Sequence, residues 1–188
     1  PELQIDGMQS VGVRFRAECR LACKIFARPF GGDVAFGDPI LGQPEVMVAE
    51  DALAFAGIAP PRLRENPVET HIAEKLHAYT VPRVRPNSRV KDLPDLTLLA
   101  TAQAIEVRQL RAASDQTFDF RGTHAVPDLL PAPPDAWNKP YASLAKENRL
   151  RWSTLDEVFE AARAFLGPVL VGHSNISWNP NYWTWVED

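Results

Sequence analysis

The residues best suited to chemistry lie between Pro67 and Leu99, where a basic, proline-containing loop joins two helical patterns. One lysine lies in the first pattern and four charged residues surround the start of the second: Lys75, then Arg89, Lys91, Asp92 and Asp95. From Leu76 to Val90 there is no acidic residue, so the arginines of this loop have no counter-ion close by in sequence: Arg83, Arg85 and Arg89. Such a concentration of cations, followed by two carboxylates, favours a polyphosphate or nucleic-acid site over an ordinary loop.

The start of the second helical pattern has two interpretations. Asp92 is predicted to be the helix N-cap, and Asp95 completes an arrangement like a capping box. This role explains both carboxylates but not Lys91, because a cation at a helix N-terminus opposes the helix dipole. Arg89 and Lys91 beside exposed backbone N–H groups would bind a phosphate well, so their placement favours an anion site.

Another carboxylate, Asp33, lies in a short strand pattern flanked by glycine, with the sequence GGDVAF. Metal-dependent phosphoryl-transfer sites use strand-borne acids of this kind as Mg²⁺ ligands. The alternative is a turn or capping role, which is the more frequent one for an aspartate at the end of a strand. Asp33 is a candidate Mg²⁺ ligand, with the turn or capping role as the alternative.

Lys75 lies at the edge of the apolar stripe of the first helical pattern, three residues after Ile72. Its stem would pack on the stripe and its ammonium would point along the flank of the helix. The alternative is a solvated lysine that pairs with glutamates on nearby turns, such as Glu69 and Glu74. Glu69 falls in the first helical turn, where the dipole favours an acid whatever its function.

The composition is that of a folded protein. The chain has 188 residues, enough for one sizeable domain, and 45% of them are hydrophobic and 23% charged, which excludes a disordered chain. The net charge of −4 argues against bulk nucleic-acid binding over the whole surface and leaves room for a local basic site. No apolar run approaches the roughly 20 residues that span a bilayer, and no signal peptide is evident. We therefore expect a cytoplasmic protein with no membrane contact.

The two cysteines, Cys19 and Cys23, lie four residues apart in a strand-like stretch. Four residues of extended chain cover about 13 Å, too far for a disulfide unless the chain turns between them. We expect buried thiols in a reducing cytosol. The spacing fits no zinc pattern, and none of the histidines forms a ligand pair with them.

Strand patterns dominate the first part of the chain. Residues 11–20 alternate between apolar and mostly charged side chains, which predicts a half-buried strand. Short apolar stretches at 21–26 and 31–38 follow, and together the three indicate a β-meander. A short helix is expected over 51–56, where the period changes, and Pro60 and Pro61 break it.

Helical patterns dominate the rest. An apolar stripe predicts a helix over 68–80, the longest pattern predicts one over 93–112, and shorter helices are expected over 141–148 and 154–166. Gly167 and Pro168 are predicted to close the last of these. Strands followed by helices indicate an α+β fold.

The chain is expected to divide into a β-rich part, residues 1–60, and a helical part, residues 61–188. The second part contains a proline-rich strap over about 119–140, which we expect to lie on the surface. Its tail is rich in tryptophan and is expected to pack on the core: Trp178, Trp183 and Trp185. A base-stacking or partner surface is the alternative for this tail.

Taken together, these residues resemble the AbiEii/AbiGii-type nucleotidyltransferase family, bacterial toxins of abortive-infection (phage-defence) and toxin–antitoxin systems. The resemblance spans about residues 13–99, and the preceding strand with Asp33 is similar to the family's later strand acid. Three segments carry it: Pro67-Val68-Glu69, Ile72-Ala73-Glu74-Lys75-Leu76 and Ser88-Arg89-x-Lys91-Asp92-Leu93-x-Asp95-Leu96.

The resemblance implies a small mixed sheet with a helical C-terminal part, and Mg²⁺-dependent transfer of a nucleoside monophosphate from an NTP to an acceptor such as the 3′ end of tRNA. It implies a cognate antitoxin as partner. Asp33 would be the third acid of the metal cluster, and Lys75 and Lys91 would hold the triphosphate with help from Arg89. Asp92 would orient the attacking hydroxyl or a basic group. Two further residues would bind nucleotide or support the helix start: Glu69 and Asp95. Positioning and electrostatics would carry most of such catalysis.

One departure from the family pattern is that its opening Gly-Gly/Ser turn and paired-acid strand (Asp-x-Asp) are not found. Asp6, in LQIDG, has neither a paired acid nor a preceding Gly-Ser turn. We therefore expect either the later part of a longer protein or a degenerate member, and we expect this chain alone to be inactive. Two alternatives stay open: a catalytically incomplete module that binds nucleotide, RNA or antitoxin, and a purely structural α+β domain.

Overall fold

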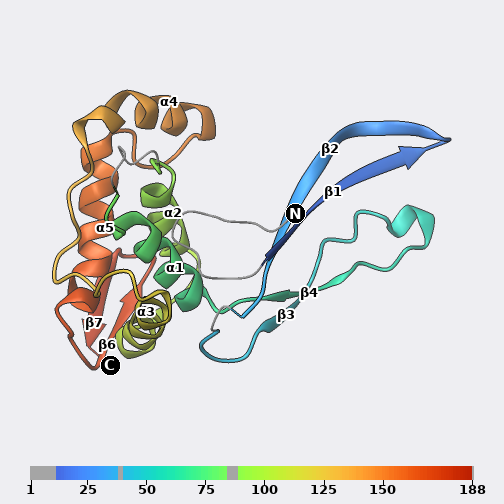
Figure 1. Ribbon diagram of the computed structural model, residues 1–188. Coiled ribbons are helices and arrows are strands. Elements are labelled where there is room, and N and C mark those ends of the chain that lie inside the picture. Colours follow the sequence, from blue (N-terminus) through green and yellow to red (C-terminus); the bar gives the residue numbers. More distant parts are fainter. Residues whose placement is uncertain (1–11, 38–39, 84–88, 188) are drawn as a thin grey trace. The chain divides into compact units, whose positions relative to one another are not determined.

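The computed structural model describes residues 12–37, 40–83 and 89–187. The chain forms two compact units, Pro1–Pro39 and Ile40–Asp188. Helices and small antiparallel sheets make up the described residues, so the fold is α+β, as the sequence predicts (Figure 1). No described helix is both long enough and apolar enough to cross a membrane.

The first unit is a β-hairpin of two long strands, β1 (Gly12–Leu21) and β2 (Lys24–Ala35). The chain reverses at Ala22 and Cys23, both with positive φ (48° and 64°), the conformation of the two-residue turns that match strand twist. The strand predicted over 11–20 is confirmed. The two stretches predicted after it form one strand, so within the described residues the unit is a hairpin and not a meander.

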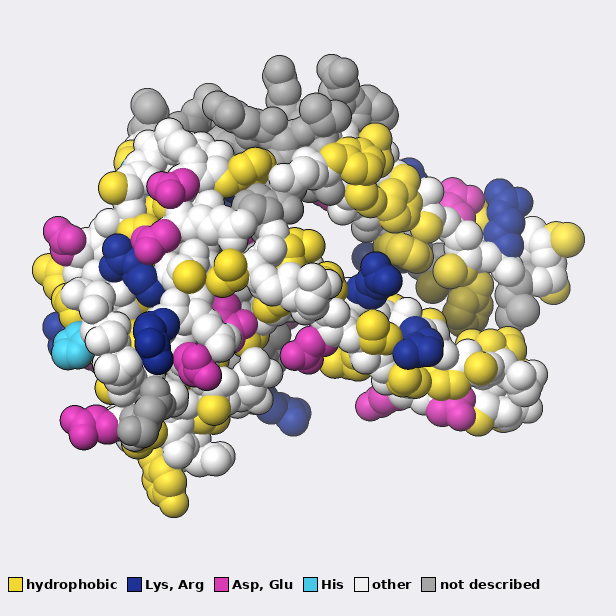
Figure 2. Space-filling view, turned by 90° about the horizontal axis from the view of Figure 1, so that it is seen from below, with side chains coloured by type: hydrophobic (Ala, Val, Ile, Leu, Met, Phe, Trp, Pro, Cys, Tyr) yellow, Lys and Arg dark blue, Asp and Glu magenta, His cyan; other side chains and the backbone are white. Residues whose placement is uncertain are grey.

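The apolar face of this hairpin is exposed, which corrects the prediction of a half-buried strand. Val13 and Phe15 are 48% and 49% exposed, and Phe30, on the same face of β2, is 57% exposed. Exposed hydrophobic side chains of this kind are coloured yellow in Figure 2. A two-stranded ribbon has no second layer of its own to cover an apolar face. For the same reason Cys19 and Cys23 are free and exposed, so the prediction of buried thiols is wrong.

The second unit begins with a shorter hairpin, β3 (Glu45–Val48) paired antiparallel with β4 (Arg62–Glu65). Between these strands the helix predicted over 51–56 is reduced to one 3₁₀ turn, η1 (Ala54–Ala56). Gly57 ends that turn in the left-handed conformation, φ 68°.

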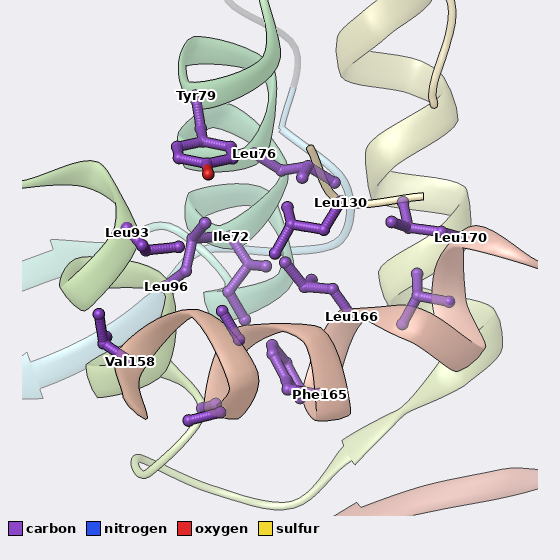
Figure 3. Close-up of a cluster of buried hydrophobic side chains, with 14 of the residues drawn as sticks. Ile72, Leu76, Tyr79, Leu93, Leu96, Leu130, Val158, Phe165, Leu166 and Leu170 are labelled. Atoms are coloured by element: carbon purple, nitrogen blue, oxygen red, sulfur yellow. The ribbon is translucent and has the colours of Figure 1, made fainter. Parts of the chain in front are cut away.

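Five α-helices form the body of the second unit: α1 (Val68–Thr80), α2 (Asp92–Leu99), α3 (Val107–Arg121), α4 (Asn138–Asn148) and α5 (Leu155–Leu170). A short 3₁₀ turn, η2 (Asp135–Trp137), leads into α4. The helix predicted over 68–80 is confirmed in full. Its stripe faces the core, where Ile72 and Leu76 are fully buried beside Phe165 of α5 (Figure 3).

The single helix predicted over 93–112 is wrong. The chain leaves α2 after Leu99, forms the two-residue strand β5 (Ile105–Glu106) and then enters α3. Ile105 pairs with Trp178 in the C-terminal part of the chain, and the Trp178 indole donates a hydrogen bond of 2.8 Å to the carbonyl of Ala100. A long-range strand pairing therefore overrides the local helical preference.

The end of α5 also differs from the prediction. Gly167 and Pro168 lie inside the helix, which continues to Leu170. Pro168 has no N–H to donate to the carbonyl four residues before it, so α5 loses one backbone hydrogen bond there. Gly172, with φ 78°, closes the helix instead, and the His173 N–H donates to the Pro168 carbonyl.

The tryptophan-rich tail packs on the core, as predicted. It forms β6 (Ile176–Asn179) and β7 (Thr184–Glu187), which continue the sheet begun by β5. Trp178 is 1% exposed, and the indoles of Trp183 and Trp185 donate to carbonyls of α5, those of Ala161 and Phe165.

We expect Trp178→Phe to destabilise the protein by about 1–3 kcal/mol, because it leaves the buried Ala100 carbonyl without its indole donor. Trp185→Phe is the matched control, and its cost should be smaller because the Phe165 carbonyl lies inside α5. Urea unfolding followed by circular dichroism measures both. Equal losses would contradict this role for Trp178.

Candidate functional site

Helices α1 and α2 bring together four of the charged residues singled out in the sequence. The buried residues Leu76 of α1 and Leu93 and Leu96 of α2 hold the two helices against the same core (Figure 3). That packing places Lys75 opposite the first turn of α2. We call the resulting group the ion cluster: Lys75, Arg89, Asp92 and Asp95.

Lys75 makes the closest contact of the ion cluster. Its Nζ donates a hydrogen bond of 2.5 Å to Asp95 Oδ2 and lies 3.5 Å from Asp92 Oδ1. Arg89 Nη1 lies 3.5 Å from the other oxygen of Asp92, Oδ2. The two cations and two carboxylates balance in formal charge, and Lys75 faces Asp92 and Asp95 across the helix interface.

Asp92 is the most deeply buried charged group of the ion cluster. Its side chain is 6% exposed, and its Oδ2 makes no hydrogen bond within the described part of the chain. A buried carboxylate without a full set of donors is costly, so a fold retains one mainly where it has a purpose. Asp92 therefore has an oxygen that a ligand hydroxyl or cation could satisfy.

Neither carboxylate caps α2, which corrects the capping prediction. Lys91 is the N-cap and no side chain bonds there, while Asp92 and Asp95 both fall in the first turn. The Asp95 N–H donates to the Lys91 carbonyl at 3.1 Å. N-capping therefore does not explain Asp92 and Asp95. Lys91 is exposed at the positive end of the helix dipole.

Two opposing influences act on the pKa of Lys75. Partial burial lowers it, while the hydrogen bond to Asp95 and the negative charges of Asp95 and Asp92 raise it. The carboxylates prevail and the pKa of Lys75 lies above its ordinary value. Lys75 is therefore a fixed cation, suited to holding a phosphate and not to accepting a proton.

Asp33, the predicted metal ligand, lies in the other unit on β2, opposite Arg14 of β1. Arg14 donates to both Asp33 oxygens, at 2.6 and 2.8 Å. This hydrogen bond is the main reason that the pKa of Asp33 is lowered; desolvation opposes it, and the charge of Arg14 adds to it. Among the described residues no three His, Cys, Asp or Glu side chains gather as a metal site would require.

Glu69 lies away from the ion cluster, in the first turn of α1. It lines an open pocket of about 970 Å³ formed by the end of the β3–β4 hairpin, the start of α1 and the turn after α2. Of the loop arginines, Arg83 donates to the Ala78 carbonyl at 3.2 Å. Arg85 and Ser88 lie outside the described residues.

A polar cluster between the ends of α1 and α3 was not predicted from the sequence. His77 Nε2 lies 2.7 Å from Thr123 Oγ1, which lies 2.9 Å from His124 Nδ1, and His124 Nε2 lies 2.8 Å from Thr80 Oγ1. Because the Thr80 hydroxyl also donates to the Leu76 carbonyl, the chain of donors runs one way, from His77 through Thr123 to His124 and Thr80. The sequence offers no signal for it, because the four residues are up to 47 positions apart.

Burial lowers the pKa of His77 to about 4, and the positive charges of His124, Arg121 and Arg83 act in the same direction. Burial also lowers the pKa of His124. Both imidazoles are therefore neutral near pH 7, and neutral His124 can accept from Thr123 at Nδ1 while it donates from Nε2 to Thr80.

A comparison with protein families gives a match over most of the chain. The family model described as nucleotidyl transferase AbiEii toxin, Type IV TA system, matches residues 9–166. The matched region contains the ion cluster, the pocket and the hairpin that bears Asp33. No curated protein matches the chain.

We expect Lys75→Met to destabilise the protein by about 1–3 kcal/mol, because it removes one of the two cations that lie 3.5 Å from the buried Asp92 carboxylate. Adding Asp92→Asn should restore part of that loss, since the double variant buries no uncompensated charge. Chemical denaturation of wild type, both single variants and the double variant measures the coupling. Strictly additive losses would show that Lys75 and Asp92 do not interact.

The stability of the protein should fall as the pH drops from about 6.5 towards 4. The folded state holds His77 neutral while the unfolded state protonates it near 6.5, so the His77 contribution is complete above 6.5 and is lost as the pH falls through about 4. The expected loss is about 2–3 kcal/mol. His77→Gln should flatten the profile measured by urea unfolding at each pH, while His173→Gln, at an exposed residue, should not. A wild-type profile without this slope would contradict the neutral state of His77.

Proposed function

Because the chain belongs to the AbiEii nucleotidyltransferase toxin family, we propose that its ion cluster holds the triphosphate of an NTP during transfer of a nucleoside monophosphate to an acceptor. The observation that carries this proposal is the buried Asp92 carboxylate. One of its oxygens has no hydrogen-bond partner among the described residues, and the carboxylate lies beside two cations at the start of a helix. Cations, backbone N–H groups and an available carboxylate are the elements that phosphoryl transfer requires.

Each residue of the ion cluster has a proposed role, and so do Lys91 and Glu69 outside it. Lys75 and Lys91 bind the triphosphate and Arg89 assists, so that fixed positive charge stabilises the charge that develops on the phosphates. Asp92 accepts a hydrogen bond from the attacking hydroxyl and orients it. Asp95 holds the Lys75 ammonium in place at 2.5 Å until the phosphate arrives. Glu69 binds another part of the nucleotide from the pocket at the start of α1.

Mg²⁺ would neutralise phosphate charge in such a reaction. Asp33 is a proposed ligand because carboxylate oxygens are the donors Mg²⁺ prefers. The described residues supply no complete metal site, and Arg14 occupies both Asp33 oxygens. The proposed roles of the described residues are therefore limited to binding of the triphosphate by the cations and orientation of the attacking hydroxyl by Asp92. The 3′ end of tRNA is the proposed acceptor, and a cognate antitoxin is the proposed partner.

A second candidate function is supported by that incomplete metal site. A module that binds nucleotide, RNA or antitoxin without turnover needs the cations of the ion cluster but no cluster of acids. The two functions share the triphosphate site and differ only in chemistry.

Thermal unfolding with each NTP, with and without Mg²⁺, tests the triphosphate site. Binding to the folded state raises the melting temperature by mass action, and we expect a shift with wild type that is lost in Lys91→Ala. Lys139→Ala is the matched control, because Lys139 is an equally exposed lysine on α4. No shift with any NTP, or an unchanged shift in Lys91→Ala, would contradict the triphosphate site that both candidate functions use.

Incubation with labelled NTP, Mg²⁺ and total tRNA separates the two functions. Labelled RNA that disappears in Asp92→Asn supports transfer. A melting shift without labelled RNA supports the binding module.

A further inference from the structure

The pocket of about 970 Å³ beside Glu69 has walls that differ in chemistry from the ion cluster. Four of its lining residues carry side-chain amides: Gln43, Asn66, Gln103 and Gln109. The amides of Gln43, Asn66 and Gln103 make no hydrogen bond within the described part of the chain, and Gln109 donates only to Glu106, at 3.0 Å. Apolar surface from Pro67, Val68 and Leu99 lines the pocket as well. Amide groups beside apolar surface can bind a flat ring by its face and its polar edge.

The charge of the pocket excludes a phosphate. Three glutamates line it, Glu45, Glu65 and Glu69, against one arginine, Arg64, which gives a formal charge of −2 with His71 neutral. Glu45 and Glu65 are direct cross-strand partners of β3 and β4, an arrangement of like charges that costs stability. A ligand that donates hydrogen bonds to these carboxylates would relieve that repulsion. Carboxylates accept such bonds from the exocyclic amino groups of nucleobases.

We propose that this pocket binds a nucleobase that carries an exocyclic amino group. This inference rests on the proposed function and adds a base-binding site to its triphosphate site. The two sites lie on the same helices, the pocket at Glu69 and Leu99 and the ion cluster at Lys75 and Asp95. Glu69 and Lys75 are six positions apart, which is about 9 Å along the axis of α1 and about 120° around it. The base belongs either to the NTP or to the acceptor RNA.

Binding of uncharged nucleosides to the whole chain, measured by equilibrium dialysis, tests the pocket separately from the triphosphate site. We expect adenosine, guanosine or cytidine to bind at least about fivefold more tightly than uridine, which lacks the amino group. Gln103→Ala should weaken that binding about fivefold or more. Gln116→Ala is the matched control, because Gln116 is an exposed glutamine of α3 that does not line the pocket. Circular dichroism verifies that both variants are folded.

Competition experiments identify the source of the base. Displacement of the bound nucleoside by NTP assigns the pocket to the nucleotide substrate, and displacement by a short RNA with a free 3′ end assigns it to the acceptor. Inorganic tripolyphosphate should not displace the bound nucleoside, because it has no base.

Three results would overturn the inference: uridine binding as tightly as the other nucleosides, unchanged binding in Gln103→Ala, or displacement of the nucleoside by tripolyphosphate. Its failure is distinct from that of the proposed function. If Lys91→Ala loses the NTP melting shift but no nucleoside binds, only the base-binding pocket is contradicted. If nucleosides bind but Lys91→Ala leaves the NTP melting shift unchanged, only the triphosphate site is contradicted.

Discussion

The burial of the Asp92 carboxylate is the constraint that organises the helical unit around the candidate site. A charge that is 6% exposed costs several kcal/mol unless cations compensate it, and α1 and the segment before α2 supply Lys75 and Arg89. Lys75 can reach Asp92 only if α1 and α2 pack in one register, the register in which Leu76, Leu93 and Leu96 are fully buried. The apolar packing and the ion cluster therefore require the same arrangement of the helices. A cavity-forming change in this interface would disturb the electrostatics of the site as well as its stability.

Local sequence patterns predicted α1 and the residues of the ion cluster, because both depend on short-range spacing. The stripe that includes Ile72 and Leu76 fixes the face of α1 that is buried, and Lys75 then lies at its edge. The boundary of α2 could not be read in this way, since it depends on Trp178, a residue 78 positions from the carbonyl that its indole bonds. The capping role of Asp92 failed for a related reason. α2 begins one residue earlier than the pattern indicated, with Lys91 at the N-cap, and the Asp92 carboxylate is paired with Lys75 and Arg89 instead of with backbone N–H groups.

The hairpin of β1 and β2 shows a second limit of sequence patterns. Alternation predicted the strand of residues 12–21 correctly, but alternation says only which side chains share a face and nothing about what covers that face. Val13, Phe15 and Phe30 share the apolar face and are all exposed. On the opposite face Arg14 and Asp33 form a two-point ion pair. An exposed ion pair of this kind contributes little to stability. It does affect cation binding, because any cation that binds Asp33 must compete with Arg14.

In the proposed function, the ion cluster and the pocket beside Glu69 bind different parts of a nucleotide because their charges differ. The cations at the ion cluster, Lys75, Arg89 and the neighbouring Lys91, are exposed or partly exposed. A phosphate that binds there would take the place of the carboxylates that now pair with Lys75. The pocket has a formal charge of −2 and three amides without a hydrogen-bond partner among the described residues, so it disfavours phosphate and offers hydrogen bonds to a neutral ring. A ligand with a polar ring at one end and a polyphosphate at the other fits both, and it fits in one orientation only, because reversing it would bring like charges together at the pocket. The segregation of charge along α1 thus sets the direction in which such a ligand would lie, before any catalytic group acts on it.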